Sequence, residues 1–212
     1  MIVSLLSQKI TILFIKKGYI LEKEKDIYQY GFEILISSCV GISIILFLGL
    51  LFSTGIESIL FLFCLISLRQ YTGGYHAKSY LNCNLTLLGT YMICIFVNKI
   101  LMCNTSIFPF FILILFLPFL FVIIRYAPIE NINKSINKEN KALYKIRSVI
   151  IFLSYYIFLI FLTRFNVSLG IFIFVVISLV IVTMVVEIIK QRLENYEKKC
   201  FQSNDQNNKF GL

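Results

Sequence analysis

The sequence predicts an all-α integral membrane protein with about six transmembrane segments. Of its 212 residues, 58% are hydrophobic and only 15% are charged, and the mean hydropathy is +0.85. Leu, Ile, Val and Phe occur in runs that are too long for the surface of a water-soluble globule. This composition excludes a soluble enzyme, a disordered regulator and a secreted disulfide scaffold.

The first 29 residues predict an amphipathic helix that lies in the membrane interface. Apolar residues such as Leu5, Ile10 and Phe14 alternate with Lys9 and Lys16 in a helix-compatible pattern. The segment is too polar to span a bilayer, and it lacks the small-residue site of a cleavable signal. We therefore expect residues 1–29 to lie on the cytoplasmic face and to remain in the mature protein.

Six apolar segments follow, and the second of them is short or broken. The first runs from about Phe32 to Phe52, and the second covers only the 13 residues from Ile56 to Leu68. Thirteen helical residues extend about 20 Å, whereas the hydrocarbon core of a bilayer is about 30 Å thick. The remaining expected spans are residues 85–102, 107–124, 148–163 and 167–186.

Positive charge lies almost entirely on one set of connections. Every Lys and Arg except Lys99 and Arg164 belongs to the N-terminal arm, the 69–84 loop, the 125–147 loop or the tail after Glu187. Cytoplasmic loops retain positive charge, so we expect both termini in the cytoplasm. The net charge of +9 then fixes topology and attracts anionic membrane lipids, and nucleic acid is not an expected partner.

The cysteines and the single histidine do not predict a metal site, a cofactor or a disulfide framework. There is no CxxC pair, and one histidine cannot complete a zinc or haem attachment motif by local spacing. The six cysteines are scattered along the chain, at positions 39, 64, 83, 94, 103 and 200.

The loop of residues 69–84 holds His76 together with Cys83, which lies outside the apolar spans. A thiol near neutral pH is mostly protonated, so a nearby imidazole base is the usual means of forming the reactive thiolate. Positions seven apart on one helix are separated by about 10 Å along the axis, which is too far for proton transfer. The two residues can therefore react together only across a break, which the Gly73-Gly74 pair would permit. No acidic third member is evident, and we expect a dyad.

Residue types alone leave other interpretations open. Six spans with a broken second segment also suit a small transporter or channel, although the spans carry few polar ladders. A structural assembly factor with an incidental Cys83 is a third reading. Arg69 could be only a topology anchor, and the lysines of the 125–147 loop could serve topology alone.

The loop resembles a known active-site signature. The loop contains the run Arg69-Gln70-Tyr71-Thr72-Gly73-Gly74-Tyr75-His76-Ala77, and Cys83 follows seven residues after the histidine. This pattern is similar to the active-site signature of the AgrB family, the accessory gene regulator peptidases of Gram-positive bacteria. The resemblance extends to the chain length, the spans and the basic loop after the fourth span. That loop contains the family-like runs Ala127-Pro128-Ile129-Glu130-Asn131 and Asn133-Lys134. Family members often have Pro after the Asn-Lys pair, where this chain has Ser135.

The resemblance implies a cysteine endopeptidase of the bacterial cell membrane. Such an enzyme processes a short AgrD-like pro-peptide, the precursor of a cyclic autoinducing peptide used in quorum sensing. Cys83 matches the nucleophile and His76 the general base. Arg69, Gln70 and Gly74 match positions that would hold the oxyanion or the substrate. An acyl-thioester on Cys83 would then be passed on for thiolactone or lactone cyclisation.

The resemblance also organises the chain and suggests partners. Residues 30–187 would form the membrane peptidase domain, which contains the catalytic loop 69–84 and the basic cytoplasmic loop 125–147. Residues 188–212 would form a polar cytoplasmic tail. A homodimer is implied. The pro-peptide of this family has an acidic tail, for which the basic loop offers docking lysines, namely Lys134, Lys138 and Lys141.

Overall fold

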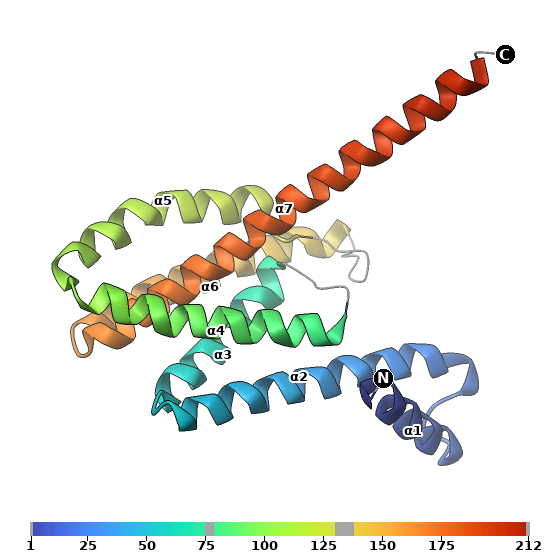
Figure 1. Cartoon of the computed structure of the whole chain (residues 1–212), viewed down its shortest axis with the longest axis horizontal. Helices are drawn as coiled ribbons and strands as arrows, with labels where there is room; N and C mark the ends of the chain where they lie inside the picture. Colours follow the sequence, from blue (N-terminus) through green and yellow to red (C-terminus); the bar gives the residue numbers. More distant parts are fainter. Residues whose placement is uncertain (1, 75–78, 130–137, 211–212) are drawn as a thin grey trace. The chain divides into compact units, whose positions relative to one another are not determined.

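The structure is a computed structural model that describes residues 2–74, 79–129 and 138–210 (Figure 1). Regular structure in these residues is entirely helical, which confirms the predicted all-α class. The α-helices and the short 3-10 helices η1 and η2 are, in chain order, α1 (Ile2–Lys16), η1 (Glu22–Glu24), α2 (Lys25–Leu51), α3 (Gly55–Thr72), α4 (Tyr80–Met102), η2 (Thr105–Ile107), α5 (Phe108–Tyr126), α6 (Lys138–Thr163) and α7 (Val167–Phe210).

Within the described residues, 5 helices are long and apolar enough to cross a membrane, as expected for a multi-pass protein. They correspond to α2 and to α4 through α7. The predicted short second segment is α3, which has 18 residues and carries Glu57 in its first turn and Arg69 in its last. These charges reduce its apolar length, so α3 is not among the candidate spans, and the predicted count of about six is approximate.

Several expected boundaries differ from the structure. The α2 helix begins at Lys25 and the α6 helix at Lys138, seven and ten residues before their expected starts. The α4 helix begins at Tyr80, five residues before the expected start at Leu85, so it includes Cys83. The last helix continues from Val167 to Phe210, well beyond the apolar span that the sequence predicts. These extensions mix polar with apolar residues, so the limits of an apolar run do not mark the helix ends.

The chain divides into two compact units. The N-terminal unit comprises residues 1–62 and 77–93, and the C-terminal unit comprises residues 63–76 and 94–212.

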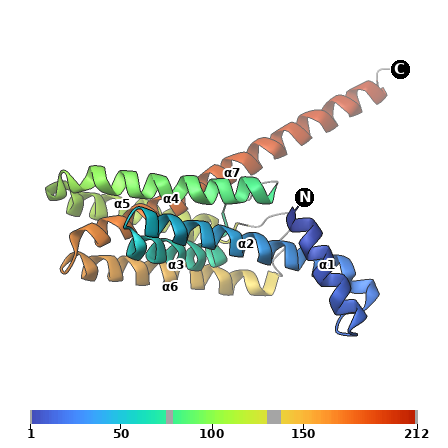
Figure 2. The same ribbon diagram turned by 60° about the horizontal axis from the view of Figure 1, so that its bottom comes forward.

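In the N-terminal unit, α1 lies beside the N-terminal part of α2 in both views (Figures 1 and 2). The face of α1 that is buried is polar, because Ser7 and Thr11 are fully buried. Its exposed side chains include Leu5 and Leu13, each about half exposed. An apolar face without a protein partner suits a helix that rests in the lipid interface, where the sequence predicts α1 to lie.

The buried face of α2 consists mostly of small residues. Ser37, Gly41, Ile45 and Gly49 recur every four residues and are its buried positions. A Cβ atom on Gly41 would lie 2.9 Å from Asn84 Oδ1 on α4, and one on Gly49 would meet the side chain of Ser58 on α3. Small residues allow close approach of helices in membranes, where dispersion replaces the hydrophobic effect as the packing force.

The C-terminal unit is built around α7. Every residue from Ile171 to Ile177 is buried, and 61% of the most apolar window of this helix is buried, against 11% for α5. A helix that is apolar on all sides belongs in a protein interior. The α5 and α6 helices pack against α7 and against each other, with Phe116 stacked on Phe152 at 6.0 Å between ring centroids.

We expect Gly49→Ala to lower the free energy of unfolding by about 1–3 kcal/mol, because the new Cβ would lie 2.8 Å from Ser58 Cβ and force α2 and α3 apart. Gly31→Ala is the control on the same helix, since nothing lies within 4 Å of its built Cβ and alanine favours a helix. Thermal unfolding of the purified proteins in detergent compares the two. Equal melting temperatures for both variants would show that the contact is not tight.

Candidate active site

Cys83 lies in the first turns of α4 and is exposed. Ser79 caps the start of this helix. Its Oγ accepts a hydrogen bond from the Asn82 backbone N–H at 3.2 Å, and its carbonyl accepts one from the Cys83 N–H at 3.0 Å. The α3 helix ends at Thr72, so the continuous rod that would hold positions 76 and 83 apart is not present. His76 itself lies outside the described residues.

A carboxylate on α2 anchors the start of α4. Tyr80 Oη donates a hydrogen bond to Glu33 Oε2 at 2.8 Å. The second oxygen, Oε1, accepts hydrogen bonds from Ser7 Oγ at 3.3 Å and Gln29 Nε2 at 3.5 Å. All of these residues belong to the N-terminal unit. Glu33 therefore connects α1, α2 and the helix that carries Cys83.

Sequence analysis missed Glu33. The single indication of its role in the sequence is that an acidic residue stands at the start of an otherwise apolar span, where a charge needs a partner. The partner Tyr80 lies 47 positions away, and no local pattern predicts such a contact.

A second polar contact holds α4 further along the helix. Tyr91 is fully buried and shares hydrogen bonds of 2.8 Å with the hydroxyls of both Thr54 and Ser58. Tyr80, Asn84 and Tyr91 thus lie along one face of α4, each in contact with α2 or with the start of α3. Because both contacts fix the rotation of α4, the direction of the Cys83 side chain is also constrained.

In the C-terminal unit, the end of α3 is held by the segment that follows α5. The Ile129 N–H donates to the Thr72 carbonyl at 3.0 Å. Gly73 has φ +76°, and a Cβ there would lie 2.6 Å from the Ile129 carbonyl oxygen. Only glycine accommodates both the positive φ and this contact at low cost. The Ala127-Pro128 peptide just before Ile129 is cis.

Two residues of the expected positioning set, Arg69 and Gly74, lie together. A Cβ on Gly74 would lie 3.3 Å from Arg69 Nε, so the Arg69 side chain lies next to this buried glycine. Gln70 is exposed at the end of the same helix. The Tyr71 carbonyl accepts a hydrogen bond from Ser148 Oγ at 3.5 Å, which ties the end of α3 to α6.

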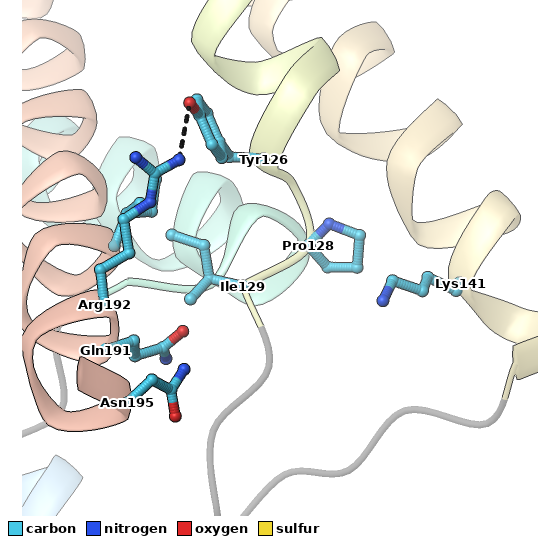
Figure 3. A pocket seen from close by; sticks show the side chains of 8 residues that line it. Tyr126, Pro128, Ile129, Lys141, Gln191, Arg192 and Asn195 are labelled. Carbon is cyan, nitrogen blue, oxygen red and sulfur yellow. Dashed lines mark hydrogen bonds between the residues drawn. The ribbon is translucent and has the colours of Figure 1, made fainter. Parts of the chain in front are cut away.

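Of the expected docking lysines, only Lys141 has a described side chain. Lys134 lies outside the described residues, and Lys138 begins α6 with a side chain that is not described. Lys141 lines a pocket of about 310 Å³ in the C-terminal unit, together with Tyr126, Pro128, Ile129, Ile188, Gln191, Arg192 and Asn195 (Figure 3). Among the described residues, no group of three or more His, Cys, Asp or Glu could hold a metal ion.

These features define a multi-pass helical membrane protein with an exposed cysteine at the start of a membrane-spanning helix. The chain belongs to the AgrB family, because the family model described as accessory gene regulator B matches residues 7–189.

Two relatives agree with this family. The chain is 35% identical over 127 residues to an AgrB-like protein of Clostridium perfringens strain SM101, and equally to AgrB-like protein 2 of strain 13. Each alignment covers 56% of this chain and 57% of the relative, so the chain spans little more than half the length of these proteins. No solved structure matches the chain significantly.

Cys83 and Cys103 provide a test of the predicted orientation, because both are exposed. Cys83 lies in the first turns of α4, and Cys103 directly follows this helix, whose 23 residues extend about 35 Å. In variants that retain one cysteine each, we expect a membrane-impermeant maleimide to label Cys83 only in inside-out vesicles and Cys103 only in intact cells. Labelling from the opposite sides would place the termini outside the cytoplasm.

Proposed function

We propose that the chain is a membrane cysteine endopeptidase that cleaves an AgrD-like pro-peptide during production of a quorum-sensing signal. The main support for this proposal is family membership over residues 7–189. These residues include a cysteine that is exposed at the start of α4, just after a helix break. The N-terminus of a helix favours negative charge, which suits the anions that form during acyl transfer. Cys83 is the proposed nucleophile and His76 the proposed base.

The proposed first step is acyl transfer to the enzyme. His76 takes the thiol proton, and Cys83 Sγ attacks a backbone carbonyl carbon of the pro-peptide. When the tetrahedral intermediate collapses, the C–N bond breaks and the imidazolium returns the proton to the leaving amine. The products are a released C-terminal fragment and an acyl-thioester on Cys83.

The proposed second step closes a ring. A Cys or Ser side chain inside the bound peptide attacks the thioester carbonyl, and the Cys83 thiol leaves. Exchange of one thioester for another is nearly balanced in energy, so the ring forms only if the internal nucleophile is held close and water is excluded.

Arg69, Gln70 and Gly74 are proposed to stabilise the oxyanion or to position the substrate. The contact between Arg69 and Gly74 supports this assignment for two of them, since a side chain at position 74 would displace the guanidinium. Docking of the pro-peptide on Lys134, Lys138 and Lys141 stays a prediction, as does a homodimer.

Cys83→Ala and His76→Ala should each reduce cleavage of a co-expressed pro-peptide by at least about a thousandfold, because each removes an essential reacting group. Cys103→Ala is the matched control, since it removes an exposed cysteine at the other end of α4 and should leave cleavage unchanged. The measurement is the released fragment by mass spectrometry, with membrane insertion verified for each variant. Normal cleavage by both active-site variants would instead favour a transporter or an assembly factor.

Tyr80→Phe and Glu33→Gln should each lower kcat about tenfold with little change in KM, because a hydrogen bond to a charged group orients the start of α4. The double variant should be no slower than the slower single variant, because both changes remove one interaction. Tyr28→Phe is the control, since Tyr28 is an exposed tyrosine on α2. A rise in KM alone would assign Tyr80 and Glu33 to substrate binding.

A further inference from the structure

The pocket that contains Lys141 lies where three candidate spans of the C-terminal unit end. Tyr126 is the last residue of the span Phe108–Tyr126, and Lys141 is the second residue of the span Asn140–Thr163. The remaining helical lining comes from residues 188–195, near the end of the span Val167–Glu197. Three spans that end at one pocket place it at the depth of the lipid headgroups.

The polar lining of the pocket is suited to an anion. Figure 3 shows Gln191, Arg192 and Asn195 on α7 facing Lys141 on α6, with the 126–129 segment between the two helices. A guanidinium, an ammonium and two amides contribute hydrogen-bond donors. One of these amides, Gln191 Nε2, also donates to Glu187 Oε1 at 3.5 Å. None of the described side chains that line the pocket is acidic.

Tyr126 holds the guanidinium of Arg192 in place. Arg192 Nη2 donates a hydrogen bond to Tyr126 Oη at 3.4 Å, and Arg192 Cζ lies 5.8 Å from the centre of the same ring. A guanidinium has five N–H donors, and this bond uses one of them. The arrangement orients a planar fork, which matches the geometry of phosphate oxygens.

Apolar groups complete the pocket and surround it. Pro128, Ile129 and Ile188 contribute to its lining. On the same part of α7, Ile189 and Leu193 are exposed by 52% and 59%. Apolar side chains exposed at this level of a membrane helix indicate contact with lipid, here on a face of α7 next to the one that lines the pocket.

We propose that this pocket binds the phosphate-containing headgroup of an anionic phospholipid. The acceptor oxygens of the phosphate meet Arg192 and Lys141, and the glycerol carbons meet the isoleucines. The site does not depend on the proposed peptidase activity. It is nevertheless connected to the candidate active site, because Ile129 lines the pocket and also bonds to Thr72 and packs on Gly73. A bound headgroup thus stabilises the contact of Ile129 with Thr72 and Gly73, within the 69–84 loop.

Native mass spectrometry of the full chain in detergent tests the site with phosphatidylglycerol and phosphatidylcholine. We expect the wild type to retain phosphatidylglycerol in preference, and Arg192→Gln and Lys141→Gln to weaken this binding about tenfold each. The matched control is Lys145→Gln, one turn after Lys141 on α6 and outside the pocket lining. This control removes the same charge and should bind as the wild type does.

Three outcomes would overturn the proposal. The first is equal loss in pocket and control variants, which would mean non-specific charge attraction. The second is displacement of phosphatidylglycerol by an equal concentration of inorganic phosphate, which would reassign the pocket to a soluble anion. The third concerns a hexaglutamate peptide that binds the wild type. If the two pocket substitutions abolish binding of this peptide but leave binding of phosphatidylglycerol unchanged, the pocket belongs to an acidic peptide.

Discussion

The structure depends on how the chain satisfies its backbone hydrogen bonds where α3 stops and α4 begins. At the edge of a membrane, an interrupted helix leaves carbonyl and N–H groups that cannot all rely on water. The Thr72 carbonyl is satisfied by the Ile129 N–H, and the Gly73 N–H donates to the Arg69 carbonyl at 3.1 Å. On the other side, Ser79 caps α4. These bonds let α3 end at Thr72, three residues after the start of the 69–84 loop, with the Thr72 carbonyl and the Gly73 N–H both satisfied.

Much of this architecture follows from sequence, because its causes are local. Long apolar runs predict helices in lipid, and the short run from Ile56 to Leu68 predicts a segment that cannot span as the others do. The need for a break between positions 76 and 83 follows from helix geometry alone, and the ends of α3 and α4 agree with it. The start of α4 at Tyr80 was missed because a serine cap, and not hydropathy, sets that boundary.

The parts that could not be predicted are contacts between distant residues. Glu33 looks like an ordinary charge at a span end, and only folding brings it to Tyr80. Likewise, Ile129 belongs to a segment more than fifty residues after Gly73, and neither residue carries a signal that the two will meet. Sequence thus indicated which residue types the candidate site uses, whereas the supporting contacts come from the three-dimensional structure.

The polar inner face of α1 has a mechanical consequence. Ser7 of α1 and Tyr80 of α4 bind opposite oxygens of the Glu33 carboxylate. A helix lying in the lipid surface responds to the thickness and curvature of the bilayer. A displacement of α1 relative to α2 would therefore act on the same side chain that holds the start of α4.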